Sequence, residues 1–90
     1  MTAPLPLGRV VATPGALKLL METGGNPFYY LARHATGDWG ELCAFDLRQN
    51  EIALREGYRV LSSYETAAGH LWIITEADRS ITTILLPEEY

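Results

Sequence analysis

The side chains best suited to chemistry gather in one short stretch, Leu31–Gly40, and just beyond it. His34, Asp38 and Glu41 supply an imidazole and two carboxylates within eight residues. General acid–base catalysis uses these groups, and so do sites for hard metal ions. Titratable residues at the ends of helices more often cap or pair than catalyse. We therefore favour a structural interpretation, in which protonated His34 interacts with the carbonyl end of a helix, Asp38 caps the next turn and Trp39 closes the core.

A second set of polar side chains lies in the C-terminal half of the chain. Arg79 stands between Asp78 and Ser80 in an expected hairpin turn. An arginine that holds a phosphate, with His34 or an acid for proton transfer, would suit a small metal-independent ribonuclease or toxin of the barnase or RelE type. The expected strands add Arg59, Ser62, Ser63, Tyr64, Thr82 and Thr83. Turn chemistry and strand propensity explain the same residues without catalysis.

The overall charge argues against nucleic acid as a partner. Seven basic and eleven acidic residues give a net charge of -4. This balance opposes binding to phosphate backbones and leaves no polybasic surface for anionic lipid. The acidic excess is small and scattered, so a DNA mimic that inhibits restriction ranks third among the functions that we consider.

Length and cysteine content narrow the class of protein further. Ninety residues predict one domain over 1–90. Cys43 is the only cysteine, which excludes an internal disulfide and a multi-cysteine metal site within one chain. We expect no metal and no cofactor. No stretch approaches the ~20 apolar residues of a membrane helix, and the first residues lack a secretory pattern, so a cytoplasmic location is expected.

Proline and glycine divide the first half of the chain into short helices. Thr13-Pro14 and Asn26-Pro27 each combine a capping side chain with a proline at the first helical position. Gly24 and Gly37 are placed to end the two helices. The expected elements are a flexible or extended arm over 1–6, a short strand over Leu7–Ala12, helices from Pro14 and Pro27, and a third helix over Glu41–Glu56.

After Gly57 the hydrophobic period changes from helical to two. The alternation predicts strands over Tyr58–Glu65, His70–Glu76 and Ser80–Leu86. Their short connections, including Ala77-Asp78-Arg79, predict antiparallel neighbours. The fold class is therefore α+β: two or three N-terminal helices, with a possible short first strand, followed by a three-stranded antiparallel meander.

The last two expected strands are apolar on both faces. Alternation groups Trp72 and Ile74 with Ile84, and Tyr64 is a further candidate for this surface. An apolar second face in so small a protein either completes a core or forms an interface. We predict a small interaction module that binds a protein partner or forms a homodimer, with neither nucleic acid nor membrane as its target.

Four segments, at 12–17, 33–40, 59–64 and 74–90, resemble a group of short bacterial proteins. Members of this group are labelled hypothetical, plasmid-related or type I restriction subunit M. The resemblance implies a protein carried by a plasmid or another mobile element. It does not imply a methyltransferase, because that fold needs a doubly wound sheet with a glycine-rich first turn.

Overall fold

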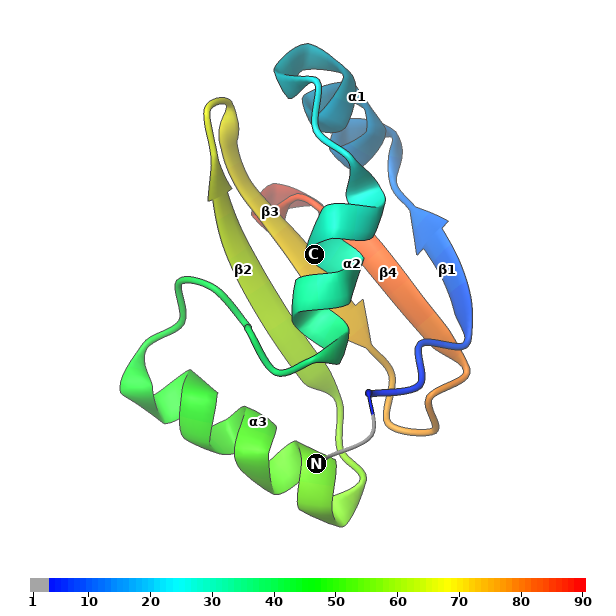
Figure 1. The fold of residues 1–90 in the computed structure, drawn as a ribbon, viewed down its shortest axis with the longest axis vertical. Coiled ribbons are helices and arrows are strands. Elements are labelled where there is room, and N and C mark those ends of the chain that lie inside the picture. The colour runs from blue at the N-terminus through cyan, green and yellow to red at the C-terminus, as the bar shows by residue number, and fades with distance from the viewer. Residues whose placement is uncertain (1–3) are drawn as a thin grey trace.

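The computed structural model describes residues 4–90 and shows an α+β fold, in which helices pack on a four-stranded mixed sheet (Figure 1). The elements in chain order are β1 (Arg9–Ala12), α1 (Pro14–Thr23), α2 (Pro27–Ala35), α3 (Ala44–Glu56), β2 (Val60–Thr66), β3 (Gly69–Thr75), β4 (Ile81–Leu85) and the 3-10 turn η1 (Pro87–Glu89). The strand order across the sheet is β1-β4-β3-β2. None of the described helices combines the length and the apolar run needed to cross a membrane.

The α+β class and the three predicted helices are confirmed, but the sheet has four strands and is mixed, because the short first strand joins it. β2, β3 and β4 are antiparallel neighbours, as expected, whereas β1 pairs in parallel with β4. α3 begins at Ala44 and not at Glu41, because Gly40 forms an isolated parallel bridge with Ser63. The segment around Gly40 therefore lies beside β2 before α3 begins.

The capping signals act as the sequence indicates. The side chains of Thr13 and Asn26 accept hydrogen bonds from the backbone N–H groups of Ala16 and Phe28. Each cap is followed by proline at the start of the helix. Local chemistry thus fixes where α1 and α2 begin, and α2 then crosses one face of the sheet (Figure 1).

The two faces of the sheet differ in what covers them. Leu31 of α2 packs in one buried cluster with side chains of the inner face, among them Leu71, Ile73 and Ile84. The outer face carries Leu61, Ser63, Trp72, Ile74, Thr83 and Leu85, as strand alternation and the pairing registers require. None of the three helices crosses this outer face in the described part of the chain (Figure 1).

The predicted grouping of Ile84 with Trp72 is wrong, because the β3–β4 connection is one residue longer than expected. The Glu76 N–H donates to the carbonyl oxygen of Ile81 at 3.0 Å, which closes a loop over 77–80 instead of 77–79. Ile84 therefore pairs with Ile73 and faces α2. A shift of one residue moves every side chain of a strand to the opposite face.

The described part of the N-terminal arm packs against the rest of the fold. Leu5 is only 8% exposed and packs in a second cluster with Trp39, Ala53 and Val60. Its backbone N–H donates to the carbonyl oxygen of Ala35 at 2.8 Å. The described part of the predicted arm, Pro4–Pro6, thus packs on the core through Leu5, and residues 1–3 lie outside the described residues.

Candidate functional site

His34 lies at the centre of a chain of buried hydrogen bonds between α2 and the sheet. The last turn of α2 directs its ring inward, where the side chain is fully buried. Nδ1 lies 2.5 Å from Ser62 Oγ on β2, and Nε2 lies 2.8 Å from Thr75 Oγ1 on β3. Thr75 Oγ1 lies 2.8 Å from Thr82 Oγ1 on β4, which donates to the carbonyl oxygen of Leu7 at 2.7 Å. This series of hydrogen bonds thus joins α2 to β2, β3 and β4 and to Leu7, which precedes β1.

The last acceptor of this hydrogen-bond series, a carbonyl oxygen, determines which group donates in each of its hydrogen bonds. A carbonyl oxygen only accepts, so Thr82 uses its hydroxyl hydrogen on Leu7 and must accept from Thr75. Thr75 therefore accepts from His34 Nε2–H, and Nδ1 accepts from Ser62. The network thus assigns His34 the neutral form with the proton on Nε2.

Burial holds His34 in this neutral form. Loss of water around the ring, together with the positive charge of Arg79, lowers the pKa of His34 from 6.5 to about 4. The interpretation of His34 as a protonated residue that interacts with helix carbonyls is therefore wrong. The ring turns to the sheet because the strands offer hydroxyl groups that satisfy both of its nitrogens.

The pair of His34 and Ser62 resembles the base and nucleophile of acyl-transfer enzymes in composition only. Such a nucleophile must reach a substrate, whereas both side chains are fully buried here. Both ring nitrogens already have partners within the protein. The arrangement therefore locks the sheet to α2 and offers no exposed base for catalysis.

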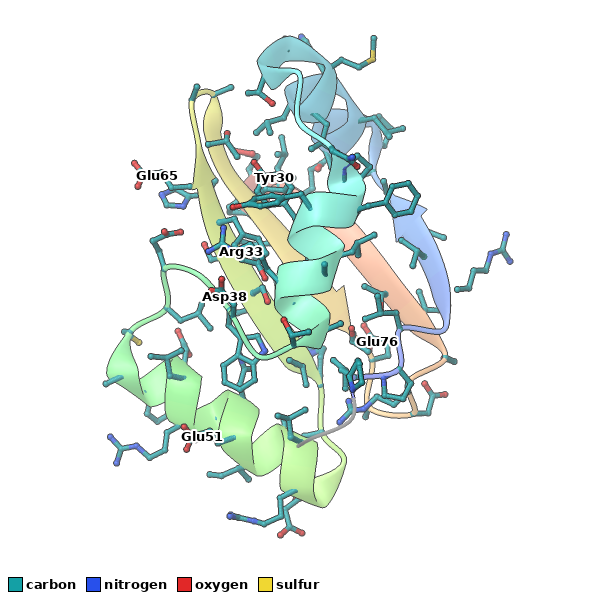
Figure 2. The ribbon with its side chains drawn as sticks, viewed as in Figure 1. Tyr30, Arg33, Asp38, Glu51, Glu65 and Glu76 are labelled. Atoms are coloured by element: carbon teal, nitrogen blue, oxygen red, sulfur yellow. The ribbon has the colours of Figure 1, made fainter. Side chains whose placement is uncertain are left out.

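Asp38 is directed away from His34 and pairs with Arg33. Figure 2 shows Arg33 on α2 pointing toward Asp38, and the guanidinium donates to the two carboxylate oxygens at 2.7 and 3.2 Å. These hydrogen bonds with Arg33 lower the pKa of Asp38. The Arg33 guanidinium also lies over the ring of Tyr64, 4.5 Å from its centroid. The third titratable residue of the stretch, Glu41, accepts the backbone N–H of Glu65 at 2.8 Å.

Tyr64 belongs to this corner and not to the surface around Trp72. Its side chain is fully buried on the inner face, and its hydroxyl donates to the carbonyl oxygen of Asp38 at 2.6 Å. Burial raises the pKa of Tyr64 to about 12. The corner at Asp38 is thus anchored by an ion pair and by a neutral phenol, which is a structural arrangement.

Trp39 closes the lower core, as the sequence indicates, but with one hydrogen-bond donor unsatisfied. The side chain is 8% exposed and packs against Leu5, Ala53 and Val60. Its Nε1–H has no acceptor among the described residues. A buried donor without a partner lowers the stability of the folded state by about 1–3 kcal/mol, so this indole N–H is a polar group that an acceptor would stabilise.

Arg79 lies in the same pocket wall as His34, so the fold brings these two predicted residues together. Its backbone has the left-handed conformation, with φ of 62°, in the β3–β4 hairpin. Its guanidinium donates to the carbonyl oxygens of Tyr58, Glu76 and Ala53 at 2.6, 3.2 and 3.1 Å. Arg79 thus ties the hairpin to the end of α3, while Asp38 takes no part in this pocket.

The predicted binding residues Trp72 and Ile74 line a groove on the outer face. This outer groove has a volume of about 450 Å³ and is lined by Trp72, Ile74, Leu61, Ser63, Arg59 and Tyr90, among others. Tyr90 packs edge-on against Trp72, with ring centroids 5.9 Å apart. The chain's own C-terminal turn therefore covers part of the surface that we predicted to be an interface.

The two edges of the sheet are the feature that the sequence did not reveal. At the β2 edge, the Asn50 side chain bonds both the N–H and the C=O of Leu61, at 3.1 and 2.6 Å. Ser63 bonds the backbone of Trp39 and Glu41, at 3.0 and 2.7 Å. Side chains and a loop thus replace a neighbouring strand along β2.

The β1 edge is open by comparison. The N–H groups of Arg9 and Thr13 bond Ser80 and Ile84 at 2.9 Å each, so these positions of the strand face β4. In a parallel pair the intervening residues point the other way, which directs the backbone groups of Val10 and Ala12 outward. No described residue covers them, and this edge is therefore the exposed backbone surface of the sheet.

Comparison with known proteins adds no relative: neither a family model, nor a curated protein, nor a solved structure matches the chain. Within residues 4–90 there is also no group of three His, Cys, Asp or Glu side chains placed to hold a metal ion. The features of the molecule that indicate a function are the open edge, the outer groove and the pocket beside Arg79.

Proposed function

We propose that the protein is a self-associating interaction module in which β1 pairs with β1 of a second copy. The observation that carries the proposal is the difference between the two edges of the sheet, because only the β2 edge is closed by Asn50 and by the segment around Gly40. An open edge with unpaired N–H and C=O groups is a template for another strand.

One antiparallel register uses all the outward backbone groups. It places Val10 opposite Ala12 of the second copy, so that these residues exchange N–H···O=C bonds in both directions. Val11 then faces its own counterpart on a two-fold axis, as an isologous dimer requires. Arg9 faces Thr13 of the second copy, so the pairing brings no like charges together.

The side chains around this edge support the same proposal. Val10 and Val11 are 42% and 37% exposed, and Ile81 on the neighbouring strand is 38% exposed. Strand pairing would remove these apolar side chains from water, and two sheets would continue as one across the dimer. The outer groove offers less for this purpose, because Tyr90 already packs on Trp72.

Proline at position 10 should separate the copies without disturbing the fold. The Val10 N–H points away from β4, so V10P removes an intermolecular donor and leaves the β1–β4 pairing intact. We expect a dimer for the natural sequence in sedimentation at about 100 µM, and at least a tenfold weaker association for V10P. V10T keeps the N–H and the branched side chain, and is the matched control.

Circular dichroism of V10P should equal that of the natural sequence. A monomer of the natural sequence at this concentration would refute the proposal. A V10P protein that keeps both its fold and its dimer would refute the edge as the interface while leaving self-association intact.

The ribonuclease alternative has less support from the geometry. It needs a histidine that can exchange a proton with substrate, whereas His34 is buried and its ring nitrogens are bonded to Ser62 and Thr75. Arg79 lies in the wall of the same pocket, but the imidazole beside it is closed off from a substrate. A hydrolytic role would require this core to open.

A further inference from the structure

A second pocket, here called the arm pocket, lies where the N-terminal arm meets the end of α2, α3 and the β3–β4 hairpin. It has a volume of about 490 Å³, and its walls include Leu5, Pro6, His34, Trp39, Leu54 and Arg79. Pockets of about 300–1,000 Å³ with apolar walls and a few polar groups are typical of small-molecule sites. The arm pocket has this size and this composition.

The arm pocket contains a positive charge without a counter-ion. Arg79 is half-buried, and its Nη atoms donate to backbone carbonyl oxygens. The ion pairs found within residues 4–90 join Lys18 to Glu22, Arg33 to Asp38 and Arg55 to Glu56, and none includes Arg79. His34 beside it is held neutral by the network described above. A pocket with one uncompensated cation favours an anion.

A side chain in the wall of the same pocket carries a buried donor that lacks an acceptor. The Trp39 ring forms part of the wall, and its Nε1–H is unsatisfied within the described residues. An indole N–H only donates, so it can be satisfied only by an acceptor such as a carboxylate oxygen. Because this donor is closed off from the open pocket, Trp39 contributes its ring to the wall and reports on a ligand that binds beside Arg79.

The remaining walls are apolar and determine the other end of the ligand. Leu5 and Pro6 belong to the arm, and Leu54 on α3 is 45% exposed at the pocket. A fully hydrated anion such as phosphate would gain nothing from these walls, whereas a hydrocarbon or aromatic body would be removed from water. The chemistry of the walls thus selects a ligand with one anionic end and one apolar end.

We propose that the arm pocket binds a small organic carboxylate with an apolar body, held by Arg79 against the wall that the Trp39 ring helps to form. This function is separate from self-association, because the pocket is built from the arm, the helix ends and the hairpin, whereas the open edge is β1. Either proposal can fail without the other.

Benzoate is the probe, and the indole N–H signals in a ¹⁵N-correlated NMR spectrum are the readout. Trp39 and Trp72 give two such signals, which the W72F variant assigns. We expect benzoate to shift the Trp39 signal saturably, with a Kd on the order of 1 mM, while the Trp72 signal stays in place. Benzamide has the same shape without the charge, and should bind at least about tenfold more weakly. Inorganic phosphate tests whether any anion suffices, and should shift Trp39 less than benzoate does.

Two variants test the role of the pocket charge. R79Q removes the charge and keeps an N–H donor for the carbonyl oxygens of Tyr58 and Ala53, and should weaken benzoate binding at least about tenfold. R59Q removes a cation from the outer groove and is the matched control, with unchanged binding. If R79Q fails to fold, L54E places a competing carboxylate at the exposed rim of the pocket and should weaken binding by a similar factor.

Three results would overturn the proposal. They are a Trp39 signal that does not move up to about 50 mM benzoate, equal shifts with benzoate and benzamide, and unchanged binding in a folded R79Q or L54E protein.

Discussion

Acidification from pH 7 to pH 4 should lower the free energy of unfolding by about 3 kcal/mol through His34 alone. The pKa of His34 falls from 6.5 to about 4 on folding, because the ring is buried and lies near Arg79. Below pH 6.5 His34 is therefore protonated in the unfolded chain but stays neutral in the folded chain. Each further unit of pH lowers the free energy of unfolding by about 1.4 kcal/mol. The contribution is fully present above pH 6.5 and is lost by about pH 4.

Urea unfolding at several pH values measures this loss, and H34Q identifies its source. Glutamine does not titrate, so H34Q should show a much flatter pH dependence between 4 and 6.5. It should also lose about 1–3 kcal/mol at neutral pH, since Ser62 or Thr75 is left without a partner. The exposed His70 provides the matched control, and H70Q should keep the full dependence.

An equally steep loss between pH 6.5 and 4 in H34Q would contradict the assignment.

Asp38 affects stability in a different range of pH. Its pKa is lowered by Arg33, so its contribution is lost only as the pH falls below the ordinary aspartate value of 3.8.

Replacing Gly40 by alanine should destabilise the protein by about 3 kcal/mol or more. Gly40 has φ of 73°, and an added Cβ would lie 2.1 Å from the carbonyl oxygen of Ser63. The backbone cannot retreat without breaking the hydrogen bonds that join Ser63 to Trp39 and Glu41. The substitution therefore combines left-handed backbone strain with the loss of the segment that covers β2.

Gly37 separates these two costs, because it also has a left-handed φ, of 91°, but an added Cβ would meet open space. G37A should lose only the backbone term, about 1–2 kcal/mol. Chemical denaturation of G40A and G37A measures the difference between them. If both variants lose the same free energy of unfolding, the close approach of Gly40 to Ser63 does not contribute to the effect.

Local chemistry made the helix starts and the meander predictable. The caps at Thr13 and Asn26 act within a few residues, so neighbouring sequence is enough to identify them. The faces of β4 were not predictable in this way, because they depend on whether Ser80 belongs to the hairpin loop or to the strand. Arg79 adopts a left-handed φ in this loop, and the sequence Asp-Arg-Ser does not indicate this conformation, because it contains no glycine or asparagine.

The candidate site was predictable in its members but not in its contacts. The sequence singles out His34, Asp38, Trp39 and Arg79, and each of them makes structural contacts in the folded protein. It does not indicate that His34 bonds Ser62 and Thr75, since these partners lie 28 and 41 residues away. It also does not indicate that Asp38 pairs with Arg33 and not with His34, because both residues lie in the last turn of the same helix, close to Asp38 in sequence.

The parallel pairing of β1 with β4 has a consequence for the order of folding. The two strands lie near opposite ends of the sequence, so β1 has no partner while the ribosome is still making the rest of the chain. The meander can close earlier, because its strands are consecutive. During that interval both edges of β1 are open, and a crowded solution favours capture by β4 of another molecule. Domain-swapped oligomers are therefore the misfolded products that this topology invites.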